Sequence, residues 1–148
     1  MDPVSVASNI ITEPNLLLAV IIPLFGSLVV MTLKNHPNLR EFVSSAASIL
    51  LFCMVLSFIP ALREGKTLVY PIFQLLPGLS ITLRADGFSM IFAMVASSLW
   101  TIAVFYSMGY MRGLHEHAQT RFNACFALAI FGAIGVALSD NLFTMYLF

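Results

Sequence analysis

Long uncharged stretches alternate with short charged clusters along the chain. The uncharged stretches cover residues 16–33, 42–62, 87–111 and 122–139. A bilayer core about 30 Å thick needs roughly 20 helical residues, so each stretch is long enough to form a transmembrane helix. A short apolar tail begins near residue 141 and predicts the start of a fifth span. We therefore expect an all-α polytopic transmembrane helix bundle, a single membrane domain over residues 1–148 that forms the N-terminal part of a longer bundle.

Residues 67–83 are also uncharged, but their pattern differs from that of the four spans. Pro71 and the Pro77-Gly78 pair interrupt this stretch, and apolar residues then alternate with polar residues from Leu79 to Arg84. Alternation with a period of two is typical of a β-strand. Because irregular backbone in lipid would leave polar groups unpaired, we expect a short extracytoplasmic β-hairpin or extended loop here.

Composition narrows the class of protein. Hydrophobic residues make up 59% of the chain and charged residues 9%, whereas soluble domains contain about 25% charged residues. This excludes a soluble globular domain and makes the lipid bilayer the solvent. The formal net charge is zero, and without a basic stripe nucleic acid is excluded as a partner. Cys53 and Cys125 lie in two different apolar stretches, where we expect small hydrophobic side chains rather than a disulfide.

The basic residues favour one orientation by a narrow margin. If the N-terminus lies outside, the outer loop contains Arg63, Lys66 and Arg84. The inner loops then contain Lys34, Arg40, Arg112 and Arg121. Since cytoplasmic loops carry an excess of Lys and Arg, we expect a multi-pass protein of the cell (inner) membrane with an extracytoplasmic N-terminus.

Candidate chemistry is sparse. The four predicted spans contain no ionisable side chain, although ion pathways usually place such groups inside the membrane. The hydroxyls of Ser97, Ser98 and Thr101 are expected to bond to their own helix backbone. The cluster His115-Glu116-His117 lacks the further ligands of a metal site and more often forms a solvated loop. We therefore predict no catalytic residue, no metal site and no cofactor, and no ion pumping by this segment alone.

Asp140 and Asn141 lie between the fourth span and the apolar tail. Both residue types are favoured as helix N-caps. An acid at the mouth of two spans could instead mark an ion path. The cap is the favoured interpretation, and both remain open at this point.

The fourth span contains small residues at a helical spacing. They are Ala129, Gly132, Ala133 and Ala137. Small residues let helix backbones approach closely in membranes, so we expect this thin face to pack against another helix rather than lipid. Ile134 is expected to face differently.

Several segments resemble a known family. They are residues 86–89 (DGFS), 106–113 (YSMGYMRG), 117–122 (HAQTRF) and 141–148 (NLFTMYLF). They are similar to motifs of the antiporter-like membrane subunits of respiratory complex I and of Mrp cation/proton antiporters. The stretch that starts at His117 looks closer to the D subunit of Mrp antiporters. The positions that match the family motifs are Asp86, Gly87, Gly109, Tyr110, Arg112 and Arg121.

The resemblance implies a larger helical bundle in which buried acids and lysines carry protons, with an outside N-terminus and a hairpin on the outer face. The relay glutamate of the fifth helix would come after Phe148, so no relay residue maps onto this chain. What the resemblance implies is a helix-packing and assembly role in a proton-translocating subunit. Its partners would be other membrane subunits, with protons and sodium as candidate ions. In a complex I-like assembly, this would be a translocase subunit.

Two other functions remain open at the level of sequence. The absence of charge from the spans also fits a small accessory membrane protein that assembles a complex without transport of its own. A compact four-helix exporter is less favoured, because such transporters usually place an acid within a span.

Overall fold

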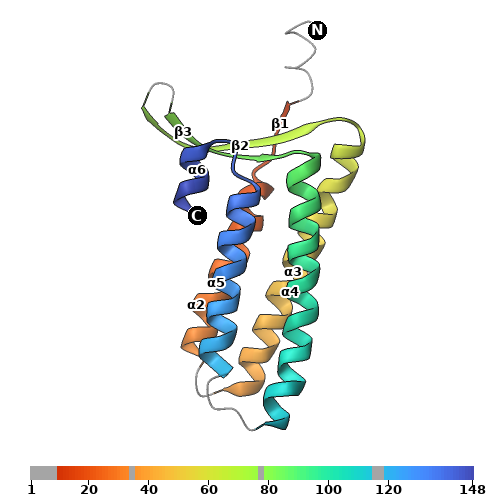
Figure 1. Cartoon of the computed structure of the whole chain (residues 1–148), viewed down its shortest axis with the longest axis vertical. Helices are drawn as coiled ribbons and strands as arrows, with labels where there is room; N and C mark the ends of the chain where they lie inside the picture. The colour runs from red at the N-terminus through yellow and green to blue at the C-terminus, as the bar shows by residue number, and fades with distance from the viewer. Residues whose placement is uncertain (1–9, 34–35, 77–78, 115–118) are drawn as a thin grey trace, which may run out of the picture.

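Four long helices stand together in the computed structural model, and a small sheet covers one end of them (Figure 1). The structure describes residues 10–33, 36–76, 79–114 and 119–148. The long helices are α2 (Asn15–Thr32), α3 (Pro37–Arg63), α4 (Gly87–Gly113) and α5 (Gln119–Ala137), followed by the short helix α6 (Leu142–Leu147). All four long helices have the length and apolar composition to cross a membrane. The predicted helical bundle of a multi-pass membrane protein is confirmed.

The first turn of α3 departs from the expected boundary. The helix begins at Pro37 rather than near residue 42, and proline is favoured at the first helical position because its missing N–H has no partner there. Arg40 and Glu41 therefore lie inside the helix, and both are buried. The helix thus extends beyond the uncharged stretch of residues 42–62, because charged residues end an uncharged stretch without ending a helix.

The predicted hairpin is present. Strand β2 (Thr67–Leu76) pairs antiparallel with β3 (Leu79–Ala85), with Tyr70 opposite Leu83. A third strand, β1 (Ile10–Thr12), pairs parallel with β2. The sequence does not predict β1, because a segment this short has no readable period. The Pro77-Gly78 pair lies outside the described residues.

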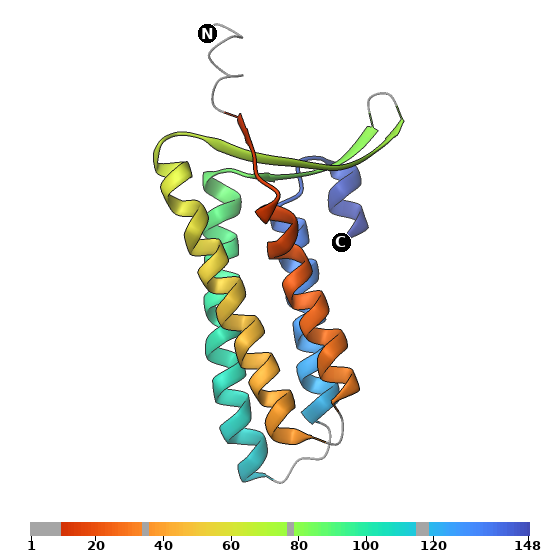
Figure 2. The same cartoon turned by 180° about the vertical axis from the view of Figure 1, so that it is seen from behind.

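The core lies between two helix pairs. Helix α2 packs most extensively against α5, and α3 against α4, as Figures 1 and 2 show from opposite sides. The fully buried side chains of this core include Leu16, Leu51, Trp100 and Ile134. Leu68 and Leu83 of the hairpin extend the same core toward the sheet. The hairpin therefore belongs to the packed structure.

The helices alternate in direction and give the bundle two distinct ends. The sheet end contains β1, β2, β3 and the connection from α5 to α6, whereas α2 ends and α3 begins at the far end (Figure 1). The His115-Glu116-His117 cluster lies outside the described residues. Within the described part of the chain, no group of His, Cys, Asp and Glu could hold a metal ion.

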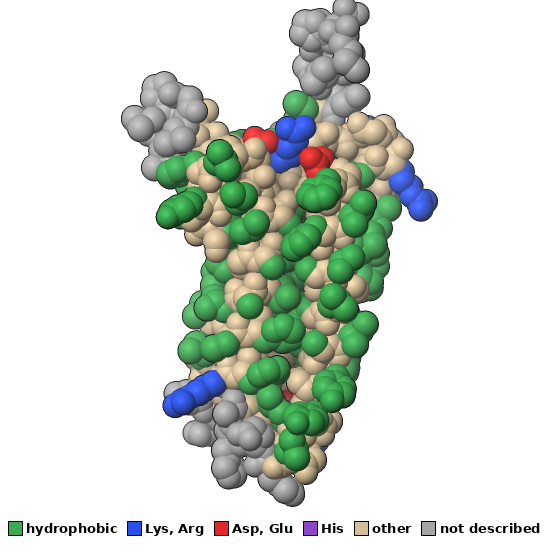
Figure 3. Space-filling model, in the orientation of Figure 1, with side chains coloured by type: hydrophobic (Ala, Val, Ile, Leu, Met, Phe, Trp, Pro, Cys, Tyr) green, Lys and Arg blue, Asp and Glu red, His purple; other side chains and the backbone are tan. Residues whose placement is uncertain are grey.

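Hydrophobic side chains cover the flank between the two ends, and the visible charged side chains lie near the ends (Figure 3). Exposed apolar residues on α4 include Ile91, Phe92, Ile102 and Phe105. Cys53 and Cys125 are free and exposed. This surface has the character of one that faces lipid or other membrane helices.

Candidate ion-path mouth at the sheet end

Backbone hydrogen bonds attach the connection between α5 and α6 to the sheet. The N–H of Arg84 donates to the Leu138 carbonyl at 2.7 Å, and the N–H of Asp140 donates to the Thr82 carbonyl at 3.1 Å. These bonds extend the β3 edge by one bridge between Leu83 and Ser139. The start of α6 is thus fixed relative to the hairpin.

Asn141, rather than Asp140, is the N-cap of α6. Its side-chain oxygen accepts from the Thr144 N–H at 2.7 Å, and its Nδ2 donates to the Ser80 carbonyl at 2.7 Å. The buried hydroxyl of Thr144 donates to the same Asn141 oxygen and accepts from the N–H of Thr82. One capping residue therefore joins the helix to the strand.

Asp140 points away from the cap and toward Arg84. Its Oδ1 lies 3.4 Å from Arg84 Nη1, and the two side chains are 32% and 49% exposed. A solvated pair at this distance contributes little to stability. The carboxylate remains accessible at the surface of the sheet end, at the connection where the sequence left an ion-path mouth open as the alternative to a helix cap.

Asp86 starts α4 with a capping box. Its Oδ1 accepts from the Ser89 N–H at 2.9 Å, and the Ser89 hydroxyl accepts from the Asp86 N–H at 2.9 Å. Hydrogen bonds from the Ser89 backbone and hydroxyl hold the pKa of Asp86 below its usual value, because they stabilise the ionised form. The family-motif pair Asp86-Gly87 thus has a local structural role.

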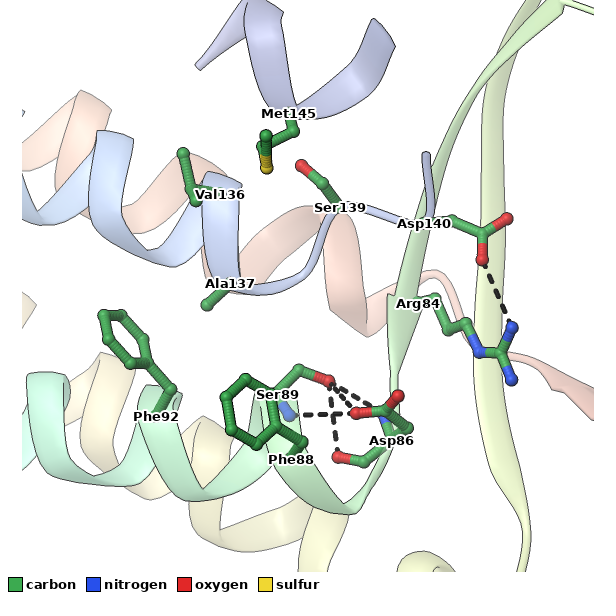
Figure 4. A pocket seen from close by; sticks show the side chains of 10 residues that line it. All are labelled: Arg84, Asp86, Phe88, Ser89, Phe92, Val136, Ala137, Ser139, Asp140 and Met145. Atoms are coloured by element: carbon green, nitrogen blue, oxygen red, sulfur yellow. Dashed lines mark hydrogen bonds and ion pairs between the residues drawn. The ribbon is translucent and has the colours of Figure 1, made fainter. Parts of the chain in front are cut away.

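A cavity of about 550 Å³ lies between these groups (Figure 4). It is lined by Arg84, Asp86, Phe88, Ser89, Phe92, Val136, Ala137, Ser139, Asp140 and Met145. Polar groups gather on the side next to β3, and apolar side chains of α4, α5 and α6 form the rest (Figure 4). Because Ser89 already bonds to Asp86 and Arg84 already faces Asp140, a cation would have to compete with both partners.

At the far end, charged residues form bonds between helices that the sequence patterns did not predict. Arg112 donates from Nε to Glu41 Oε1 at 3.1 Å and from Nη2 to Glu41 Oε2 at 2.5 Å. Arg40 donates from Nη1 to Thr120 Oγ1 at 2.7 Å and from Nη2 to Gln119 Oε1. A signal existed, because Arg40 and Glu41 share the helical spacing of the other buried residues of α3, which are Ser44, Ser48, Leu51, Val55 and Phe58.

The other family-motif residues lie at or near the ends of helices. Tyr110 is exposed near the end of α4, and its ring stacks on Tyr106 with centroids 5.8 Å apart. Gly109 has open space beside it, as does Gly87. Arg121 is exposed in the first turn of α5. Arg112 is the motif residue that the structure joins to another helix by an ion pair.

The thin face of α5 is not the face that packs inside this bundle. Ala129 is exposed, and Gly132, Ala133 and Ala137 are partly buried. Ile134 is fully buried in the core, so it faces differently from Ala129. Phe148, after α6, lies against this helix near Gly132 and Gly135.

The membrane-depth hydroxyls bond as expected. Ser97 donates to the Met94 carbonyl, and Ser98 donates to the Val95 carbonyl. Thr101 donates to the Ser97 carbonyl and also reaches the Ser48 carbonyl of α3 at 3.3 Å. All three hydroxyls bond to backbone carbonyls of their own helix, and the Thr101 hydroxyl also joins α4 to α3.

Comparison with known proteins gives this fold a context. Residues 77–123 match the family described as NADH-Ubiquinone oxidoreductase (complex I), chain 5 N-terminus. The chain is 34% identical over 137 residues to the Na(+)/H(+) antiporter subunit A1 of Staphylococcus haemolyticus. It is thus related to these membrane subunits. The same subunit of Staphylococcus aureus is 33% identical, and each alignment covers 88% of this chain and 16% of the relative.

The fold also occurs in a solved assembly. A chain of the membrane-bound sulfane sulfur reductase, an archaeal respiratory membrane complex, superposes with a TM-score of 0.70 at 23% identity. The match covers 87% of this chain and 20% of that chain, and at this identity it establishes the fold alone.

The comparisons correct one expectation. The antiporter relatives are A1 subunits, so the expected closeness to the D subunit is wrong.

Proposed function

We propose that this chain forms the N-terminal membrane portion of an ion-translocating subunit in a multisubunit cation/proton antiporter. The 34% identity to an antiporter subunit A1 over 137 residues carries this proposal. The chain spans 16% of that relative's length, and the role that we assign to this part is helix packing and subunit assembly. A complex I-like assembly is the second setting, supported by the match of residues 77–123.

The distribution of charge supports a packing role. Within the described helices, Asp, Glu, Lys and Arg occur only near helix ends, as Arg40, Glu41, Arg63, Arg112 and Arg121. A proton relay needs titratable groups deeper in the membrane. In the proposed subunit, the titratable groups of the proton relay therefore lie outside the described helices. The cavity beside Asp140 would form only the entrance to an ion path.

Affinity purification tests the assignment. The chain, tagged and expressed in its native membrane, should co-purify with other membrane subunits of an antiporter or respiratory complex. Proteoliposomes that contain the purified chain alone should show no cation-dependent proton flux above empty vesicles. Purification without any such subunit would contradict the assignment, and flux by the chain alone would contradict the packing role.

The thin face supplies a second test. We propose that Ala129 and Ala133 contact a helix outside the described bundle, because they are small and incompletely covered. Ala133→Leu should reduce co-purification of partner subunits at equal expression. Ala46→Leu makes the same change at an exposed position of α3 and should be tolerated. Equal recovery of partners with both variants would show that lipid covers the thin face.

A further inference from the structure

Three polar side chains are buried together at the far end of the bundle. Arg40 is 5% exposed, Glu41 6% and Asn123 7%. They come from α3 and α5, which touch at this end through the bonds of Arg40 to Gln119 and Thr120. Burial of polar atoms costs free energy unless each finds a partner, so each atom must be accounted for.

One nitrogen atom of the Arg40 guanidinium forms no hydrogen bond with the described residues. The two Nη atoms donate to the neutral side chains of Thr120 and Gln119. The remaining nitrogen, Nε, is buried and has no hydrogen-bond partner within residues 10–33, 36–76, 79–114 and 119–148. The neighbouring carboxylate of Glu41 accepts from Arg112 instead, through both of its oxygens.

The side chain of Asn123 contains a buried acceptor to which none of the described residues donates a hydrogen bond. This acceptor is the Oδ1 atom. Asn123 follows Gln119 by four residues and Thr120 by three, and residues at these spacings are neighbours on one face of a helix. The orphan acceptor therefore lies on the face of α5 that already receives the two Nη atoms of Arg40.

We propose that a buried water molecule binds between Arg40 Nε and Asn123 Oδ1. A water oxygen accepts from the Nε–H while a water hydrogen is donated to Oδ1, so one molecule satisfies both orphan atoms. An anion would also suit the permanently charged guanidinium, but it would face the partial negative charge of Oδ1. The pair of orphans thus selects water over a small anion and joins α3 to α5 at the end that lacks a sheet.

A crystal structure of the complete protein, grown in bromide and at a resolution that shows ordered water, tests this site. We expect a density peak within hydrogen-bond distance of both atoms and without bromide anomalous signal. An anomalous peak there would overturn the proposal in favour of an anion. The absence of any peak, with Nε bonded elsewhere, would overturn it as well.

Asn123→Leu sharpens the test, because leucine fills a similar volume without an acceptor. The peak should disappear, whereas Asn38→Leu, which removes an exposed amide at the same end, should leave it in place. A peak that persists in Asn123→Leu would overturn the assignment of Oδ1 as a partner. If the variant does not fold, the density of the unmodified protein alone decides.

Discussion

The two ends of the bundle are held by different kinds of interaction. At the sheet end, backbone bonds join β3 to the connection before α6, and the Arg84–Asp140 pair lies in solvent at 3.4 Å. At the far end, the Glu41 side chain is 8% exposed and bonds twice to Arg112. Backbone pairing tolerates many side chains, whereas a buried charge needs its particular partner. Substitutions of the same type should therefore have different effects at the two ends.

Gly135→Ala should have the largest effect, and it acts at the sheet end. A Cβ at Gly135 would lie 2.3 Å from the Phe148 ring and 2.9 Å from its Cβ, so the segment after α6 must move. Overpacking of this kind costs about 1 to 3 kcal/mol. Thermal unfolding in detergent should show a lower midpoint.

The matched change near the far end is Gly109→Ala. A Cβ there meets nothing within 4 Å, and alanine is the better helix former by about 0.5 to 1 kcal/mol. This variant should unfold at an equal or higher temperature. If both variants lose the same amount of stability, the close contact between Gly135 and Phe148 does not explain the effect of Gly135→Ala.

Removal of a carboxylate should have the next largest effect. Glu41→Ala removes the acceptor of charged hydrogen bonds and should cost about 1.5 kcal/mol, the lower end of the range because Arg112 is partly hydrated. Asp140→Ala removes the acid of the exposed pair and should cost about 0 to 1 kcal/mol. Urea unfolding of the two variants in the same detergent measures the difference, and a larger loss for Asp140→Ala would reverse our comparison of the ends.

Asp86→Ala should have a smaller effect than Glu41→Ala. Loss of an N-cap costs typically about 1 kcal/mol, and the capping box of α4 also loses the bond to the Ser89 N–H. Because the pKa of Asp86 is lowered in the folded state, its contribution is present above the ordinary aspartate pKa of about 4. It is lost as the pH falls through the lower folded pKa.

Acid unfolding provides the measurement. The stability difference between the unmodified protein and Asp86→Asn should be constant near neutral pH and should shrink at acidic pH. A difference that does not change between pH 6 and about pH 3 would show that ionisation of Asp86 does not support the cap.

The sequence predicts elements that have a long and regular pattern. The spans follow from uncharged stretches, and the hairpin follows from the alternation after Pro77-Gly78. The first turn of α3 is missed when charge alone sets the boundary, although Arg40 and Glu41 continue the helical spacing of the buried residues of α3. The bond between Arg84 and Asp140 cannot be predicted, since it depends on how β3 meets a distant connection. Local sequence patterns therefore predict secondary structure, whereas contacts between distant segments become known only from the three-dimensional structure.

The side of the membrane on which each end lies tests the central claim most directly. In a variant whose Cys53 and Cys125 are replaced by alanine, single cysteines at Lys66 and Arg84 report on the sheet end, and one at Arg121 reports on the far end. We predict that a membrane-impermeant maleimide applied to intact cells labels the first two positions, and that Arg121→Cys is labelled only after permeabilisation. Labelling of Lys66→Cys and Arg84→Cys from opposite sides would mean that the hairpin crosses the membrane and would contradict the four-span bundle.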